Sequence, residues 1–291
     1  MSTRGTPDFR GLCVLALESR RATEVAALIS TYGGKPLVAP ALREVPLESN
    51  TAALEFAAAL LRGDVEVVIL LTGVGTRALV GAVERKYSRD DFLKALGRTR
   101  VVARGPKPLA VLREMRVPVW ITVPEPNTWR ELLAAIDARA DEQTLRGARV
   151  AVQEYGMPPV ELLDGLAERG ARVSRVPVYR WALPEDVGPL KEAVAAIAAG
   201  SVDVVIFTTG VQVVHLWQIV DAMQLETQVR RGLSRAVIAS IGPSTTEELR
   251  RHSLTVDLEA SHPKFGFLIR ELAEQSRALL DAKKAQGPST V

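Results

Sequence analysis

The chain has 291 residues, of which 47% are hydrophobic, and 37 lysines and arginines oppose 34 aspartates and glutamates. Its length and apolar content are enough for two cores of ordinary domain size. The small basic excess includes no lysine and arginine cluster interleaved with aromatics, which argues against nucleic acid as a partner. No apolar run approaches the roughly 18 residues of a membrane span, so we expect no signal peptide, no membrane partner and a cytoplasmic location.

Short β-branched segments alternate with longer segments of helical periodicity, which is typical of βα units on a parallel sheet. Amphipathic helices are predicted over 21–31 and 160–169, and each is followed by a glycine stop signal, Gly33 and Gly170. Five strands per half predict an α/β fold with flavodoxin-like sheets, which bind ligands at the carboxyl ends of their strands. The predicted strands are 12–17, 35–39, 65–71, 100–103 and 119–122 in the first half, and 149–153, 172–176, 202–207, 236–240 and 255–258 in the second.

The second half of the sequence repeats the first. Residues match at an offset of 136 early in each half, and at 137 after one inserted residue. The period is far longer than the 20 to 50 residues of a solenoid repeat, so the duplicated unit is a whole domain. Two like domains predict a cleft between them, where we expect the functional site. Matched pairs include Gly34 with Gly170, Val67-Val68-Ile69 with Val204-Val205-Ile206, Thr72-Gly73 with Thr209-Gly210, and Gly105-Pro106 with Gly242-Pro243.

The loop from Thr72 to Arg77 follows an apolar strand and opens a helix. Gly73 lets the backbone approach a ligand, the first helical N–H groups can hold an anion, and Arg77 adds charge. A plain tight turn would explain the same residues. The counterpart loop, with Thr208, Thr209 and Gly210, keeps hydroxyls and a glycine at the same strand end, which favours ligand binding.

A second pair of loops also lies between an apolar strand and a helix. The loop that begins at Gly242 offers the hydroxyls of Ser244 and Thr245 at a helix start, which suits a carboxylate. Helix capping alone would also account for it. The counterpart in the first half places the cations Arg104 and Lys107 at the equivalent turn.

Tyr179 is one of only four tyrosines and lies in an extended segment, Val176 to Arg180. The ring either packs in a core or presents a phenol that donates a proton in the cleft. The histidines at 215, 252 and 262 lack metal-ligand spacing and are expected to be surface or packing residues, so we predict no metal. The single cysteine, Cys13, excludes an intrachain disulfide and is expected to pack as a small hydrophobe.

Together these residues make the chain resemble the uroporphyrinogen-III synthase family, which cyclises hydroxymethylbilane in tetrapyrrole biosynthesis. The resemblance extends from about residue 11 to 273. Its most specific segments are Ile241 to Thr245, Pro177 to Trp181, Val204 to Gly210 and Gly147 to Gly156. Two departures are the turn Glu18-Ser19-Arg20-Arg21, where many relatives have Thr-Arg-Pro, and Thr209-Gly210, where relatives often have Ser/Pro chemistry.

The resemblance implies that the chain crosses twice between its domains through a two-stranded ladder, with a cleft between two similar parallel-sheet domains. Domain one would combine 1–37 with 181–275, and domain two would be 44–175. The ladder would be formed by 38–43 and 176–180. The last residues, 286–291, are predicted to be a disordered tail from their composition.

The resemblance also implies roles for individual residues. Tyr179 matches the family's tyrosine that favours loss of the substrate hydroxyl, and Thr245 matches its threonine in the Gly-Pro loop. Substrate carboxylates would bind at the helix starts. The residues predicted to bind substrate are Thr72, Gly73, Arg77, Arg104, Lys107, Arg180, Thr208, Thr209, Gly210, Gly242, Ser244 and Thr245.

The implied reaction is loss of water from a linear tetrapyrrole, formation of a spiro intermediate and reclosure with the last ring inverted. It needs no cofactor, and we expect a monomer that receives its substrate from the upstream deaminase. The main alternative is a cytoplasmic two-domain binding or sensor protein without turnover. A nucleotide-dependent enzyme with two Rossmann-like halves ranks lower, because the chain lacks a full GxGxxG.

Overall fold

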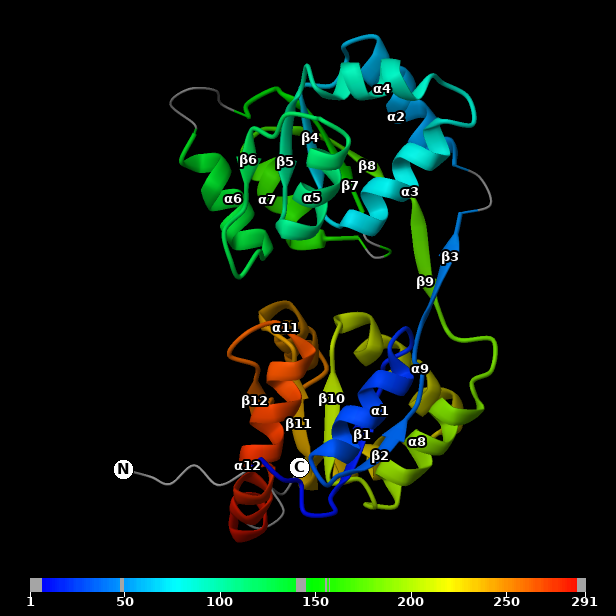
Figure 1. Cartoon of the computed structure of the whole chain (residues 1–291), viewed down its shortest axis with the longest axis vertical. Coiled ribbons are helices and arrows are strands. Elements are labelled where there is room, and N and C mark those ends of the chain that lie inside the picture. The colour runs from blue at the N-terminus through cyan, green and yellow to red at the C-terminus, as the bar shows by residue number, and fades with distance from the viewer. Residues whose placement is uncertain (1–6, 48–49, 140–144, 155, 157, 287–291) are drawn as a thin grey trace. The chain divides into compact units, whose positions relative to one another are not determined.

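The computed structural model describes residues 7–47, 50–139, 145–154, 156 and 158–286. The chain divides into two compact units. Unit 1 is Met1–Arg43 with Ala182–Val291, and unit 2 is Glu44–Trp181. Each unit is built on its own five-stranded parallel sheet (Figure 1). Of the predicted tail, only Gln286 lies within the described residues, where it ends the last helix.

The sheet of unit 1 has the strand order β12-β11-β10-β1-β2. Its central strand β10 is buried on both faces, because Val205 and Phe207 enter one core while Val204 and Ile206 enter the other. Helices α8, α9, α10 and α11 contribute to the first core, and α1 and α12 to the second. The strands are β1 (Cys13–Ala16), β2 (Lys35–Val38), β10 (Val204–Phe207), β11 (Val237–Ser240) and β12 (Leu258–Glu259). The helices are α1 (Ala22–Thr31), α8 (Gly188–Ala198), α9 (Gly210–Met223), α10 (Glu226–Arg235), α11 (Pro243–Arg251) and α12 (Phe265–Gln286).

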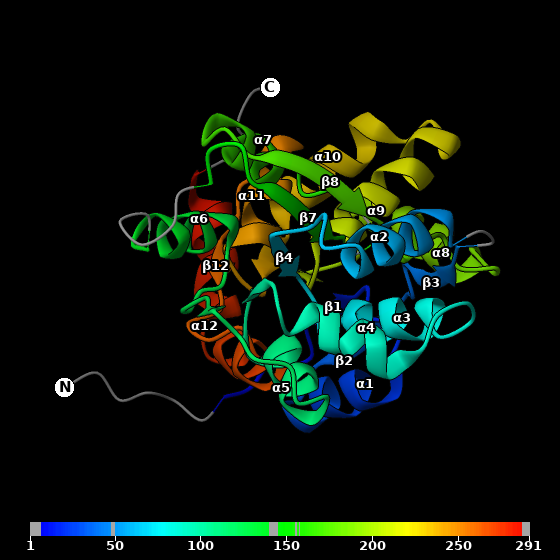
Figure 2. The same cartoon turned by 90° about the horizontal axis from the view of Figure 1, so that it is seen from above.

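Unit 2 repeats this architecture with the order β6-β5-β4-β7-β8. Helices α2 to α5 pack on one face of the sheet, and α6 and α7 pack on the other (Figure 2). The strands are β4 (Val67–Leu70), β5 (Arg100–Ala103), β6 (Ile121–Thr122), β7 (Arg149–Gln153) and β8 (Arg172–Val176). The helices are α2 (Thr51–Leu61), α3 (Gly73–Val83), α4 (Arg89–Leu96), α5 (Pro106–Glu114), α6 (Trp129–Asp137) and α7 (Val160–Glu168).

Each sheet combines strands from both halves of the sequence. In unit 1, β1 and β2 share a sheet with β10, β11 and β12. In unit 2, β7 and β8 share a sheet with β4, β5 and β6. At the 136-residue offset, β1 and β2 correspond to β7 and β8. At the 137-residue offset, β4, β5 and β6 correspond to β10, β11 and β12. Both sheets therefore have the same flavodoxin-like order, and the predicted fold class is confirmed. All ten predicted strands overlap observed ones, and the two predicted helices correspond to α1 and α7.

A separate two-stranded sheet forms where the chain passes from one unit to the other. It pairs β3 (Arg43–Pro46) with β9 (Tyr179–Ala182). The ladder was predicted at 38–43 and 176–180, whereas in the structure residues 39–42 precede the paired strand and Val176 ends β8. Three residues of the predicted ladder lie in the observed paired strands: Arg43 in β3, and Tyr179 and Arg180 in β9.

Two smaller features bear on sequence expectations. Cys13 on β1 is half-buried against the core of unit 1, and burial raises the pKa of its thiol. The stop signals Gly33 and Gly170 have φ of +69° and +77°, a conformation that favours glycine. In the part of the chain that the structure describes, none of the helices combines the length and apolarity needed to cross a membrane.

Two helical glycines give opposite predictions for the same change to alanine. A Cβ at Gly232 in α10 would overlap the backbone carbonyl oxygen of Ile197 in α8, so we expect Gly232→Ala to lower the free energy of unfolding by about 1–3 kcal/mol. The matched control is Gly81→Ala in α3, where nothing lies within 4 Å of the added carbon. There alanine should stabilise by about 0.5–1 kcal/mol. Denaturant titration measures both, and equal signs would contradict the packing of α10 on α8.

His215 should make the fold sensitive to mild acid. Its side chain on α9 is buried with Nδ1 2.7 Å from the carbonyl oxygen of Ala41, and burial lowers the pKa of the imidazole below its usual 6.5. The unfolded chain therefore takes up the proton first. The stability contributed by the neutral ring is present above about pH 6.5 and is lost as the pH falls through the folded-state pKa.

The measurement is the unfolding free energy of the wild type and of His215→Asn between about pH 7.5 and 5.5. Asparagine can still donate to Ala41 but does not titrate in this range. We expect the wild type alone to lose stability, by at most about 1.4 kcal/mol per pH unit. The same decline in both proteins would assign the effect to other groups.

Candidate functional site

The predicted ligand-binding loops follow the carboxyl ends of β4 and β10. Thr72 and Thr209 are the extended residues directly before α3 and α9. The Thr72 hydroxyl accepts from the Gly75 N–H at 3.0 Å, so this side chain caps its helix. This cap uses one N–H group of the first turn. The helix dipole at this end still favours an anion.

The loop glycines owe their identity to packing inside each unit. A Cβ at Gly73 would come within 2.9 Å of the backbone oxygen of Lys107, and one at Gly210 within 3.1 Å of the Glu248 side chain. The starts of α3 and α5 are therefore in contact in unit 2, and the start of α9 contacts α11 in unit 1. Close approach to a ligand, the reason inferred from the sequence, is not needed to explain these glycines. In unit 2 the packing instead brings two helix starts together, which strengthens the local field for anions.

A buried glutamine holds the loop of unit 1. Gln212 in α9 is 1% exposed, and its Oε1 accepts from the Thr208 N–H at 2.7 Å and the Thr209 N–H at 3.3 Å. Its Nε2 donates to the carbonyl oxygen of Leu17 at 2.9 Å, at the end of β1. One amide thus ties the carboxyl ends of β1 and β10 together, at the point where the strand order reverses.

A different glutamine does the same work in unit 2. Gln153 ends β7, the equivalent of β1, and its Oε1 accepts from the Thr72 N–H at 3.4 Å while its Nε2 donates to the Glu154 carbonyl oxygen. At the 137-residue offset the counterpart of Gln212 is Gly75, and a Cβ there would collide with the Gln153 amide. The amide is therefore supplied from the strand in one unit and from the helix in the other.

The Gly-Pro loop of unit 1 divides its hydroxyls between surface and interior. Ser244 is exposed and Thr245 is buried at 4% exposure in the first turn of α11, which begins after Gly242. The N–H groups of Thr245 and Thr246 both donate to the Gly242 oxygen at 3.1 Å, so they are not available to a ligand. The Thr246 hydroxyl lies 2.5 Å from the Ser240 hydroxyl and donates to Glu259.

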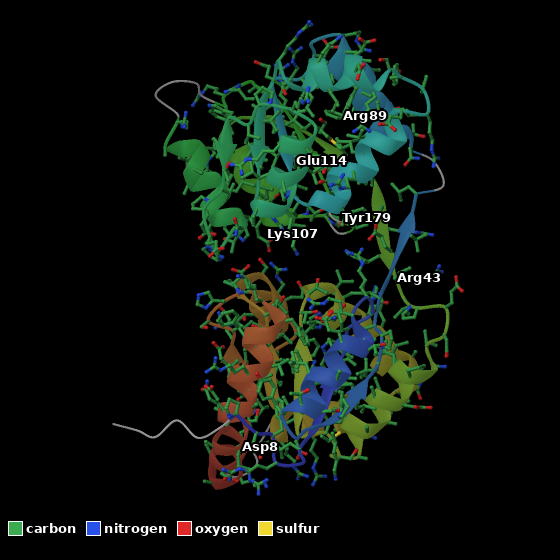
Figure 3. The ribbon with its side chains drawn as sticks, viewed as in Figure 1. Asp8, Arg43, Arg89, Lys107, Glu114 and Tyr179 are labelled. Carbon is green, nitrogen blue, oxygen red and sulfur yellow. The ribbon has the colours of Figure 1, made fainter. Side chains whose placement is uncertain are left out.

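The predicted cations differ in their surroundings. Arg77 pairs with Glu114, the last residue of α5, at 2.5 Å, and this carboxylate raises the pKa of Arg77. Lys107 lies exposed in the first turn of α5, about 10 Å along the helix from Glu114 (Figure 3). Lys107 therefore lies at the helix start that was predicted to bind an anion, whereas Arg77 is paired at the other end of α5. Arg104 is half-buried after β5, and Arg180 is exposed on β9.

Tyr179 is packed inside unit 2. It is 5% exposed, belongs to the core that includes Val176 and Val178, and meets Trp181 edge-on with ring centroids 5.4 Å apart. A Cβ at Gly156, whose φ is +90°, would lie 3.0 Å from the Tyr179 ring. The ring therefore has the fixed position that either a structural or a proton-donating role requires.

Two glutamates and the two glutamines contribute to these loops but were not among the residues predicted from the sequence. Glu18 accepts from the Thr208 hydroxyl at 3.2 Å, and Glu154, 3% exposed, pairs with Arg175 on β8. The Glu154 hydrogen bond raises the pKa of Arg175. Glu18 and Glu154 are equivalent at the 136-residue offset, just after β1 and β7. Extending the repeat by a few residues would have found this pair.

Gln212→Leu tests the bridging amide. The change leaves the Thr208 N–H and the Leu17 carbonyl buried without that partner, so we expect a loss of roughly 2–4 kcal/mol in unfolding free energy. Gln218→Leu, on the exposed side of the same helix, is the matched control and should change stability by less than about 0.5 kcal/mol. Equal effects in denaturant titrations would show that the bridge does not stabilise the fold.

Residues 23–270 match the family model described as uroporphyrinogen-III synthase HemD. The chain is 28% identical over 264 residues to the uncharacterized protein YjjA of Bacillus subtilis, covering 88% of this chain and 93% of that one. It is 31% identical over 238 residues to a protein of Methanothermobacter thermautotrophicus provisionally named uroporphyrinogen-III synthase, covering 81% and 87%.

Among solved structures, a mutant uroporphyrinogen III synthase from the extremely thermophilic bacterium Thermus thermophilus superposes with a TM-score of 0.70 at 25% identity. The match covers 94% of this chain and 100% of the Thermus chain. The family model covers well over half of the sequence, and the resemblance predicted from the loop residues is confirmed. The chain belongs to the uroporphyrinogen-III synthase family.

Proposed function

We propose that this protein is a lyase that converts hydroxymethylbilane to uroporphyrinogen III, with loss of water and inversion of the last pyrrole ring. The observation that carries the proposal is that two helices begin at the carboxyl edge of each sheet, α3 and α5 with their starts in contact in unit 2, and α9 and α11 after β10 and β11 in unit 1. Two equivalent anion-binding edges suit a flexible substrate that carries carboxylates along its length.

The proposed carboxylate ligands are backbone N–H groups and exposed side chains at these edges. Lys107 and Ser244 occupy equivalent positions at the 137-residue offset, each exposed in the first helical turn after a Gly-Pro pair. A cation at one edge and a hydroxyl at the other would bind the substrate unsymmetrically, which an asymmetric ring closure requires. The N–H groups of Thr208 and Thr209 are bonded to Gln212, so these two residues would act by positioning the start of α9.

Catalysis in this proposal depends mainly on folding the substrate. The electron-rich pyrroles supply the chemical drive for loss of hydroxide and for attack through the substituted carbon of the last ring, which gives the spiro intermediate. The original bond of that carbon to its bridge then breaks, and the inverted ring recloses through its free carbon with loss of a proton, so that water is lost overall. Binding a linear tetrapyrrole with its ends together means that the conformational entropy is lost on binding and not in the ring closure. This effect is worth up to about 7–11 kcal/mol of the barrier in favourable cases. Tyr179 would donate a proton or hydrogen bond to the departing hydroxyl.

The proposal extends to the setting of the enzyme. The substrate is unstable in water, so the partner that best fits is the upstream deaminase that forms it. We propose that the protein acts as a cytoplasmic monomer and needs no cofactor for this rearrangement.

The direct test is the isomer composition of the product. The purified protein is added to hydroxymethylbilane freshly made by the deaminase, and the oxidised porphyrins are separated by chromatography. Mostly isomer III establishes the synthase reaction. Only isomer I, the spontaneous product, would overturn it and favour a binding or sensor protein without turnover.

Tyr179→Phe tests the proton-donating role. Phenylalanine keeps the ring that packs against Trp181 and removes only the hydroxyl, so we expect unchanged folding and a kcat lower by roughly ten- to a hundredfold. Tyr87→Phe, the same change at a half-buried tyrosine of unit 2, is the control and should keep full turnover. Full turnover in Tyr179→Phe would leave the ring a purely structural role.

A further inference from the structure

A pocket lies at the edge of the unit 2 sheet where β4 and β5 begin, opposite the candidate site. It has a volume of about 800 Å³ and is bordered by the end of α2, the segment leading to β4, and the end of α4 with the segment leading to β5. The residues that carry the argument are Arg62, Glu66, Arg98 and Arg100 together with the apolar Leu61 and Val65. The candidate synthase site uses none of them.

The acidic groups at this pocket are already compensated. Asp64 pairs with Arg62 at 2.8 Å, and Glu66 accepts from the backbone N–H of Arg149 at 2.9 Å and lies 3.4 Å from its guanidinium. The Arg149 contacts lower the pKa of Glu66. After these pairs are formed, Arg98 and Arg100 remain as a net positive charge bordering the pocket.

Arg100 is the more constrained of these two cations. Its guanidinium lies over the Trp120 ring, 5.3 Å from the centroid, and its Nη1 is buried with no hydrogen-bond partner among the described residues. Burial lowers the pKa of Arg100, and Glu66 offsets only part of this effect. A buried guanidinium donor without an acceptor is costly, and an added oxyanion would relieve that cost.

The repeat shows that the fold does not require an arginine at position 100, whereas Arg98 has an arginine counterpart, Arg235, at the 137-residue offset. At the 137-residue offset Arg100 corresponds to Val237, which is fully buried at the start of β11 in unit 1. By contrast, the acid is structural in both units: Asp203, the counterpart of Glu66, accepts from the Cys13 N–H at 2.8 Å, just as Glu66 accepts from Arg149. The charge at Arg100 is therefore a feature of unit 2 alone.

We propose that this pocket binds a small organic oxyanion, with its phosphate or carboxylate group on Arg98 and Arg100 and its apolar body against Leu61 and Val65. A planar guanidinium binds either oxyanion through paired hydrogen bonds. Leu61 is 37% exposed, which leaves apolar surface for the rest of the ligand to cover. This site is independent of the proposed synthase reaction.

The test is calorimetric titration of the full chain with phenyl phosphate, benzoate and inorganic phosphate. We expect saturable binding of phenyl phosphate or benzoate that is tighter than that of inorganic phosphate, and the better of the two identifies the oxyanion. Arg98→Gln should weaken binding about tenfold, because it removes one charged hydrogen-bond donor. Arg98 is exposed, so its replacement should leave folding intact.

Two controls separate this site from general charge effects. Arg277→Gln removes an exposed arginine of α12 in unit 1 and should leave the affinity unchanged. Leu61→Ser should weaken phenyl phosphate or benzoate several-fold but not inorganic phosphate. The proposal is overturned if no probe binds saturably at millimolar concentration, or if Arg277→Gln weakens binding as much as Arg98→Gln. Isomer composition is measured separately, so either proposal can fail without the other.

Discussion

The switch in strand order leaves backbone donors and acceptors that no strand partner can satisfy, and one buried amide in each unit satisfies them. Gln212 joins Thr208 to Leu17 in unit 1, and Gln153 joins Thr72 to the Glu154 carbonyl in unit 2. These bonds are made away from water, where an unpaired group is expensive. They fix the loops after β10 and β4. The helix that follows each loop therefore presents its start to a ligand with little further loss of conformational entropy. The candidate site therefore depends on two side chains that need not touch the substrate.

The strands could be predicted because buried strands have apolar residues at consecutive positions of the sequence. Val204 to Phe207 and Val67 to Leu70 enter cores on both faces, so every position is apolar and the run is unambiguous. Which strands share a sheet was not predictable from such runs, because an apolar strand carries no signal for its neighbour. The repeat relates β1 to β7 but is equally consistent with contiguous halves. The exchange of strands between halves came from the family resemblance, and the sheet order establishes it.

The site was less predictable than the fold, since its geometry depends on partners distant in the sequence. Gly75 lies in the loop that was predicted to bind a ligand, yet it makes room for Gln153, 78 residues later in the chain. Arg77 had the right charge and loop, but the carboxylate that binds it lies on another helix. The positions of Lys107 and Ser244 at helix starts could be predicted, because the Gly-Pro pairs before them mark helix starts by local chemistry alone. Sequence patterns locate helix starts, and packing decides which side chains remain available there.

We proposed above that the helix starts at the carboxyl edges of the two sheets bind tetrapyrrole carboxylates. Hydrogen exchange of the backbone amides, with and without uroporphyrin III as a stable analogue of the product, tests it most directly. We expect slower exchange in the segments 72–76 and 106–109 of unit 2 and 208–212 and 243–246 of unit 1, with no change where β4 and β5 begin. Protection confined to one unit, or absent from all four segments, would contradict it.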